Sequence, residues 1–255
     1  MIVQCYEARS DNACMSTSAE LEASLQPKIA ATIAQLQAAA RDHDRVVYSS
    51  SLGAESLVLT DLIWTHAPQI GIFTLDTGRL HEETLSLIER LERRYGQRMQ
   101  VYYPDPAALQ AWVSANGING FYNGIAERQG CCAVRKIEPF KRAIAGAGAW
   151  ITGVRREQSS TRALAQPVEI DQANGGIAKI SPILDWTHEE VWHYIRSRRL
   201  PYNPLHDRGF PSIGCAPCTR AVEPGEDSRA GRWWWENSES KECGLHPRIR
   251  AKPAA

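Results

Sequence analysis

The sequence predicts an α/β protein: a parallel sheet of five to six strands, flanked by helices and followed by an irregular C-terminal tail. Short runs of β-branched and apolar residues alternate with longer segments of helical periodicity, which is the pattern of right-handed βαβ units. Two of the short runs end in turns rich in Ser, Gly, Thr and Asp. After Leu200, closely spaced Pro and Gly residues exclude regular structure.

The N-terminal part contains one long predicted helix. Residues 1–17 lack apolar periodicity, so they are predicted to form a disordered leader in which Cys5 and Cys14 have no specific role. Ser18 is a suitable N-cap for a helix that runs to about residue 41, because the apolar residues in this segment recur at helical spacing and give one buried stripe.

The remaining strands and helices are predicted from segments of strand-like and helix-like hydrophobic periodicity that alternate along the chain. Five strands are predicted from apolar and β-branched runs, over residues 46–48, 70–75, 99–103, 150–154 and 177–183. Helices are predicted after Ser56, over residues 81–95, from the Gly/Asn-rich break at 116–123 to about Ile144, and from Thr187 to about Arg198. The last helix opens with a capping box, Thr187-His188-Glu189-Glu190. Residues 158–167 are polar and are predicted as a loop.

Two turns at strand ends form the candidate ligand site. The first, from Ser49 to Ser56, joins a strand to a helix, and such a junction presents free backbone N–H groups to a phosphate. Gly53 allows a close approach of the backbone, and the hydroxyls of Ser49 and Ser51 add hydrogen-bond donors. The alternative is that a serine simply caps the helix. The second turn, Asp76-Thr77-Gly78-Arg79, follows the next strand and lies at the same edge of a parallel sheet.

Charge and hydropathy exclude several classes of partner. The 29 basic and 29 acidic residues give zero formal net charge, so composition supports neither nucleic-acid nor membrane binding. No segment has the ~18 consecutive apolar residues of a membrane span, and the N-terminus has no signal-peptide pattern, so a cytoplasmic location is expected. Basic residues gather between Arg220 and Lys252, which suits a small anionic ligand. Five arginines are candidates for forked hydrogen bonds to phosphate or sulfate: Arg155, Arg156, Arg162, Arg229 and Arg232.

Four of the seven cysteines form two pairs that suggest a metal centre. Cys215 and Cys218 form a CxxC knuckle, and Cys131 and Cys132 supply the other half of a four-thiolate set for Zn²⁺ or a [4Fe–4S] cluster. Neighbouring side chains on a helix diverge by about 100°, so adjacent cysteines converge poorly on one small ion. This favours the cluster over structural zinc, with four ordinary thiols as the third alternative.

Lys136 lies four residues after Cys132, which places both on one face of a regular helix. Its ammonium group is suited to offset the negative charge of a four-thiolate cluster or to reach an anionic substrate. The alternative is a solvated surface lysine.

Cys243 stands apart from the other cysteines, in a polar tail between Lys241 and His246. A thiolate is a strong nucleophile when nearby cations lower its pKa, and this tail supplies cations. The alternative is a free thiol without a role.

Together these motifs resemble the assimilatory sulfonucleotide reductases, and within them the iron–sulfur class of bacterial adenosine 5′-phosphosulfate (APS) reductases. The resemblance runs from about residue 45 to residue 246 and rests on six stretches: Ser49–Glu55, Leu75–Arg79, Cys131–Lys136, Thr152–Gln158, Gly214–Cys218 and Lys241–His246. The paired cysteines combined with the terminal Glu-Cys-Gly-Leu-His are the most specific part of the match.

The resemblance implies an adenine-nucleotide α-hydrolase-like fold and reduction of APS to sulfite and AMP. It implies that Cys243 attacks the sulfate sulfur and that a [4Fe–4S] cluster is bound. It further implies that Lys136, Arg229, Arg232 and His246 bind the phosphosulfate, and that Ser49 and Ser51 hold its phosphate end. The expected partners are the sulfonucleotide, thioredoxin or a glutaredoxin-like donor, and optionally a second copy of the chain. We divide the chain accordingly into the leader, a nucleotide- and cluster-binding domain over residues 18–220, and a mobile tail over residues 221–255 that carries Cys243.

Three other hypotheses stay open at this point. The substrate is 3′-phospho-APS (PAPS) instead of APS, or both are accepted. A more remote alternative is an ATP-using adenylating or thiolating enzyme, although Leu52 and Ala54 interrupt its usual SGGxDS loop. The last is a zinc-stabilised binding module without catalytic activity.

Overall fold

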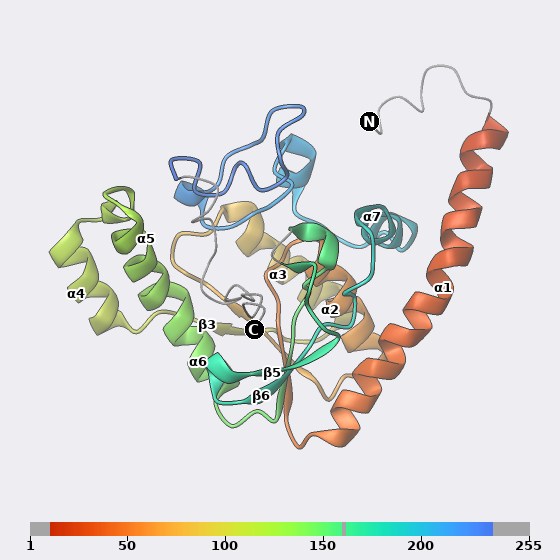
Figure 1. Cartoon of the computed structure of the whole chain (residues 1–255), viewed down its shortest axis with the longest axis horizontal. Coiled ribbons are helices and arrows are strands. Elements are labelled where there is room, and N and C mark those ends of the chain that lie inside the picture. Colours follow the sequence, from red (N-terminus) through yellow and green to blue (C-terminus); the bar gives the residue numbers. More distant parts are fainter. Residues whose placement is uncertain (1–10, 160–161, 237–255) are drawn as a thin grey trace, which may run out of the picture.

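The computed structural model describes residues 11–159 and 162–236, and the side chains from residue 19 onward. Six strands form one sheet in the order β3-β2-β1-β4-β6-β5 (Figure 1). They are β1 (Val46–Ser49), β2 (Gly71–Leu75), β3 (Gln100–Tyr102), β4 (Ala149–Ile151), β5 (Val168–Asp171) and β6 (Ile177–Ile180). The five predicted strands, β1 to β4 and β6, are confirmed and are parallel to one another. The unpredicted strand, β5, pairs antiparallel with β6 at the edge of the sheet.

The strand order creates a switch point between β1 and β4. From β1 the chain moves outward through β2 to β3, and it then returns to place β4 on the other side of β1. In open α/β sheets, ligands bind outside the carboxyl ends of the strands at such a reversal. The Ser49–Ser56 turn follows β1 and Thr152 follows β4, so both lie at the expected crevice.

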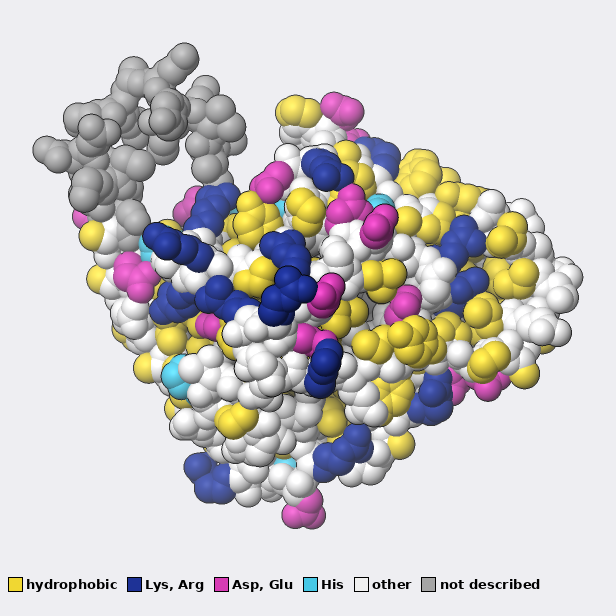
Figure 2. Space-filling model, turned by 180° about the vertical axis from the view of Figure 1, so that it is seen from behind, with side chains coloured by type: hydrophobic (Ala, Val, Ile, Leu, Met, Phe, Trp, Pro, Cys, Tyr) yellow, Lys and Arg dark blue, Asp and Glu magenta, His cyan; other side chains and the backbone are white. Residues whose placement is uncertain are grey.

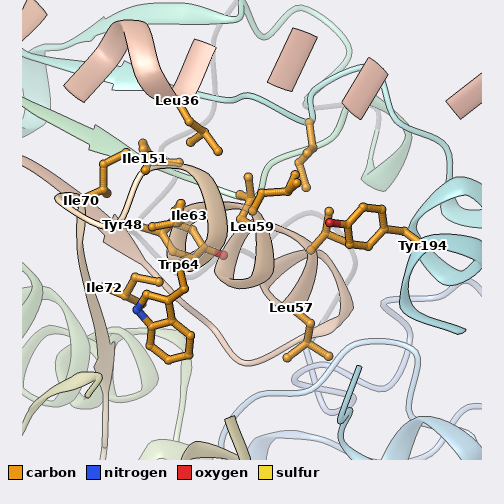
Figure 3. Packing of buried hydrophobic residues seen from close by; sticks show 14 of the residues in the cluster. Leu36, Tyr48, Leu57, Leu59, Ile63, Trp64, Ile70, Ile72, Ile151 and Tyr194 are labelled. Atoms are coloured by element: carbon orange, nitrogen blue, oxygen red, sulfur yellow. The ribbon is translucent and has the colours of Figure 1, made fainter. Parts of the chain in front are cut away.

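Helices cover both faces of the sheet. On one face, α1 (Asp11–Asp42), α2 (Ala54–His66), α3 (Glu82–Tyr95) and α7 (His188–Ser197) share a core with Tyr48, Ile72 and Ile151 (Figure 3). On the other face, α6 (Glu138–Ile144) packs its Phe140 against Phe73 and Trp150. Successive strand residues therefore enter opposite cores, as the period of two in a β-strand requires.

The predicted helix from residue 124 to Ile144 is interrupted by a wide turn. It consists of α5 (Ile125–Cys132), a π-helical segment (Ala133–Ile137) and α6. In the π segment, the N–H of Glu138 donates to the carbonyl oxygen of Ala133, five residues back. Such π turns are rare and are often found at functional sites.

Two helix predictions need correction. Helix α1 begins at Asp11 instead of Ser18, so residues 11–17 of the predicted leader are helical. Helix α4 (Pro106–Asn116) was not predicted. None of its residues is buried, although Leu109, Trp112 and Val113 recur at helical spacing and Trp112 packs beside the cysteines. Both α4 and α5 lie at the end of the molecule opposite α1 (Figure 1).

The capping box of α7 is confirmed. The Thr187 hydroxyl accepts a hydrogen bond from the Glu190 N–H at 3.1 Å, and a Glu190 carboxylate oxygen accepts from the Thr187 N–H at 2.7 Å. After Leu200 the chain has only short 3₁₀ turns among the described residues, as the Pro and Gly content predicts.

The surface carries both signs of charge. Figure 2 shows both Lys and Arg and Asp and Glu side chains on the face seen from behind, with several Lys and Arg side chains gathered left of the centre. Within the described ranges, no helix is long and apolar enough to cross a lipid bilayer.

Candidate active site

A cavity of about 490 Å³ lies at the carboxyl ends of β1 and β4, where the strand order reverses. Its walls come from the serine turn, from residues 152–155, 157 and 158 after β4, and from the irregular segment, at residues 211–214, 228, 229, 232 and 233. Nine predicted site residues line it: Ser49, Ser51, Gly53, Thr77, Lys136, Arg155, Arg162, Arg229 and Arg232. Residues far apart in the sequence therefore converge on the crevice that the strand order predicts.

The serine turn leaves the start of α2 open to this cavity. Ser51 and Ser56 bond to each other through their hydroxyls at 2.8 Å, and the Ser51 N–H donates to the Ser56 hydroxyl at 3.0 Å. Leu52 adopts a left-handed backbone with φ of 59°. The N-cap of α2 is Gly53, and it makes no side-chain capping hydrogen bond. The alternative of a serine cap is therefore wrong, and the helix start is suited to receive an anion.

Arg155 lines the cavity, but its guanidinium nitrogens bond to the protein. Nε and Nη2 donate to Glu55 Oε1 at 3.0 and 2.9 Å, while Nη1 donates to Glu157 at 2.7 Å and to the Trp186 carbonyl at 3.1 Å. Burial favours a raised pKa for Glu55, but the charge of Arg155, together with hydrogen bonds from the backbone, Gln158 and Arg155, lowers the pKa of Glu55. The ion pair thus stays charged and braces the cavity wall, and Arg155 acts as a positioning residue.

The other candidate arginines differ in their placement. Arg232 is buried and contacts the Ser212 hydroxyl at 3.3 Å and the Ile213 carbonyl oxygen at 3.4 Å. Arg162 donates to the Gln158 side chain. Arg156 is absent from the cavity lining and pairs with Asp185 at 2.6 Å. With Arg229 and Lys136, Arg162 and Arg232 give the cavity a cationic lining that suits a ligand with more than one anionic group.

The Asp76–Arg79 turn supports the cysteine knuckle more than the cavity. Of its residues only Thr77 lines the larger cavity, and its hydroxyl lies 3.2 Å from the Cys215 sulfur. Asp76 accepts a hydrogen bond from the Gly78 N–H at 2.8 Å and stabilises the turn itself. The structure therefore places Asp76 and Gly78 outside the lining, although both were predicted as ligand contacts.

The four paired cysteines meet at a second, smaller cavity of about 20 Å³. None of the four cysteines is in a disulfide, and Cys131, Cys215 and Cys218 are buried beside Phe121 and Trp233. Within residues 11–159 and 162–236, no three His, Cys, Asp or Glu side chains are placed to hold a single metal ion. Four thiols are a donor set that suits either Zn²⁺ or an iron–sulfur cluster.

Cationic side chains surround these thiols. Burial favours a raised pKa for Cys215, but Lys136, a hydrogen bond with Thr77 and the charge of Arg232 lower it. Burial and the neighbouring Cys215 raise the pKa of Cys218 to about 12, against the opposing charge of Lys136. Lys136 is half-buried and lines both cavities. This placement favours a role between the two sites over the solvated surface lysine.

The family model for the phosphoadenosine phosphosulfate reductase domain matches residues 45–221, which is more than half of the chain. The chain belongs to the phosphoadenosine phosphosulfate reductase family. It is 57% identical over 224 residues to the adenosine 5′-phosphosulfate reductase of Allochromatium vinosum, covering 88% of this chain and 87% of the relative. It is 51% identical over 226 residues to the protein of that name from Burkholderia cepacia, covering 87% of this chain and 90% of the relative.

Solved structures agree with this family membership. The phosphoadenylyl-sulfate reductase of Candida auris superposes with a TM-score of 0.60 at 25% identity, covering 70% of this chain and 83% of that one. An FMN adenylyltransferase of Candida glabrata has a TM-score of 0.55 at 16% identity, covering 91% and 79%. The second likeness shows the fold alone. The predicted fold class is thus confirmed for this member of the reductase family.

Three predicted residues of this reductase-family chain, Lys241, Cys243 and His246, lie outside the described residues. The described chain ends at Glu236, three residues after Trp233, which lines both cavities. Two residues of the site, Glu55 and Arg128, were not predicted. Glu55 was part of the serine turn but was given no role of its own. Arg128 is buried in the smaller cavity, and its spacing of four residues before Cys132 is the same signal that singled out Lys136.

Proposed function

We propose that this chain reduces APS to sulfite and AMP in sulfate assimilation. One observation carries the proposal beyond family membership: Lys136 lines both the cationic cavity at the uncapped start of α2 and the smaller cavity of the four cysteines. The two relatives described above are named adenosine 5′-phosphosulfate reductases, which supports APS over PAPS as the substrate. Family membership also argues against the ATP-using enzyme and the non-catalytic zinc module.

The cavity offers two anion sites for the two ends of the phosphosulfate. Ser49, Ser51 and Gly53 lie at the start of α2, where backbone N–H groups and hydroxyls are suited to the phosphate. Lys136, Arg229 and Arg232 also line the cavity and are assigned to the sulfate. Arg162 adds a further cation, and His246, which lies outside the described residues, is assigned to the sulfate as well. Glu55 and Arg155 hold the wall between these groups.

The reaction itself is assigned to Cys243. Its thiolate attacks the sulfate sulfur, the bond from sulfur to the bridging oxygen breaks, and AMP leaves with that electron pair. The product is a thiosulfonate on Cys243. A thioredoxin thiolate, or that of a glutaredoxin-like donor, then attacks the Cys243 sulfur and releases sulfite. The second donor thiol resolves the mixed disulfide, so two electrons come from the donor. The location we propose is the cytoplasm, where thiols stay reduced.

We assign a [4Fe–4S] cluster to Cys131, Cys132, Cys215 and Cys218. When bound, this group would supply an electrostatic contact that positions the sulfate, without carrying electrons. Support comes from the four cysteines, none in a disulfide, that line one cavity and from the cations Lys136, Arg128 and Arg135 beside them.

Protein purified without oxygen is expected to show an absorption shoulder near ~400 nm, as thiolate-bound iron–sulfur clusters do. Replacing Cys218 by Ser removes one ligand and is expected to weaken the shoulder together with the iron and sulfide content. Colourless wild-type protein with stoichiometric zinc would instead establish the zinc alternative.

The function is tested by sulfite release from APS and from PAPS, each with thioredoxin and with thioredoxin omitted. We expect thioredoxin-dependent sulfite from APS. Turnover of PAPS alone would assign the alternative substrate, and equal turnover would indicate dual specificity. Pyrophosphate release from ATP without sulfite would support the ATP-using enzyme.

A further inference from the structure

A buried ion pair ties α5 to the last described residue of the chain. Arg128 Nε donates to Glu236 Oε1 at 2.9 Å, and Arg128 Nη2 donates to Glu236 Oε2 at 2.8 Å. The two side chains are only 1% and 3% exposed. A guanidinium that meets both carboxylate oxygens fixes the direction of its partner as well as the distance. The end of the described chain is therefore held in one orientation.

This ion pair lies next to Trp233, the residue that borders both cavities. Arg128 lines the cysteine cavity, and its guanidinium carbon lies 4.8 Å from the ring centre of Trp233. The guanidinium carbon of Arg232, which lines the larger cavity, lies 4.7 Å from the same ring. Glu236 is therefore anchored three residues beyond the wall that the two cavities share.

Stability alone does not explain a buried pair of this kind. Desolvating two charges costs several kcal/mol, and apolar residues of similar volume often serve stability as well or better. What such a pair supplies is defined geometry. A second ion pair joins Arg220 to Glu226, and its side chains are 37% and 32% exposed. Glu226 lines neither cavity. It offers a matched control in the same C-terminal segment.

We propose that Arg128 and Glu236 are positioning residues that fix the point and direction from which the C-terminal tail leaves the described fold. The inference rests on the function proposed above, in which Cys243 accepts the sulfo group. Cys243 is seven residues beyond Glu236, so its distance from that anchor is at most about 25 Å. Within this distance, the direction in which the chain leaves Glu236 determines how often the Cys243 thiolate meets the sulfate sulfur.

Loss of the ion pair between Arg128 and Glu236 is expected to affect sulfo transfer and not nucleotide binding. Neither Arg128 nor Glu236 lines the larger cavity, so loss of the pair is expected to leave nucleotide affinity unchanged. The same loss misdirects the tail and slows attack by Cys243. A small misplacement of a reacting group commonly costs about 10- to 100-fold in rate. We expect an effect near the lower value, because Trp233 remains buried and still holds the chain nearby.

The first test uses full-length Glu236→Gln, which keeps the side-chain shape and removes the charge. The variant is mixed with APS without reductant, and the mass of the Cys243 peptide is followed over time. We expect sulfo transfer to slow by about 10-fold while the Kd for AMP stays unchanged. Glu226→Gln is expected to leave both values unchanged. A wild-type transfer rate in Glu236→Gln, or a loss of AMP affinity equal to the loss of rate, would overturn the proposal.

The second test separates positioning from stability. The double variant Arg128→Met/Glu236→Leu replaces the ion pair by an apolar contact, and thermal unfolding monitors its stability. We expect a Tm close to that of the wild type, with sulfo transfer still slowed. Transfer that recovers together with the Tm would make the pair purely structural. If wild-type protein itself forms no adduct on Cys243, the proposed function fails rather than this inference.

Discussion

Replacing Cys243 by Ser is expected to abolish sulfite formation from APS, with a loss of at least about 10³-fold in kcat. A serine hydroxyl stays protonated near neutral pH and cannot replace the thiolate as nucleophile without a general base. The thiosulfonate then never forms, and the thioredoxin thiol has no sulfur to attack. The variant is expected to keep its nucleotide affinity, because the serine turn and the cations that line the larger cavity remain in place.

Three measurements make this result specific to Cys243. Sulfite release gives the rate, AMP binding checks the cavity, and mass spectrometry of the tail peptide detects the sulfo group. Cys5→Ser is the matched control, since Cys5 was predicted to have no role and is expected to react like the wild type. Unchanged turnover in Cys243→Ser would refute the assignment of the nucleophile and leave the fold and family intact.

Replacing Lys136 by Ala is expected to lower kcat/KM for APS by about 10² to 10³-fold. Lys136 lies where the two cavities meet, and its charge acts on Cys215 and Cys218. A sulfate placed between these groups loses its nearest compensating cation. The effect is expected to exceed that of an ordinary surface charge, because exposed ion pairs contribute only about 0–1 kcal/mol.

The matched control is Lys141→Ala, because Lys141 is exposed on α6, five residues further along the chain. The absorption near 400 nm is recorded for both variants, to test whether the cluster remains. If Lys136→Ala keeps both the wild-type kcat/KM and the absorption, Lys136 is an ordinary surface lysine. Loss of the absorption would instead assign Lys136 to cluster retention.

Sequence alone predicts the parts of this fold that bury apolar residues at a regular period. Strands β1, β2, β4 and β6 and helices α2, α3 and α7 do so. Strand β3 was predicted from its apolar run although none of its residues is buried. Strand β5 was missed, and its Val168 and Ile170 are exposed at the sheet edge. Helix α4 was missed although Leu109, Trp112 and Val113 recur at helical spacing, and none of its residues is buried.

The site was predictable in its members but not in their contacts. The spacing of the cysteines predicts that they meet, and the carboxyl-edge rule predicts the serine turn. Neither indicates that Arg155 is held by Glu55 and Glu157, or that Asp76 turns back to the backbone of Gly78. Those outcomes depend on acceptors supplied by residues distant in the sequence or by loop conformation, for which the sequence carries no periodic signal.

The π-helical segment between Cys132 and Glu138 has a consequence for comparing this chain with others. In a π turn the backbone hydrogen bonds reach five residues back instead of four, so the segment takes in an extra residue and shifts the direction in which the following side chains point. Lys136 reaches the cysteines by way of this π turn. A chain with the same Cys-Cys-x-x-x-Lys letters in a regular helix would aim its ammonium group elsewhere. Letter-by-letter alignment can therefore equate lysines that are not equivalent in space.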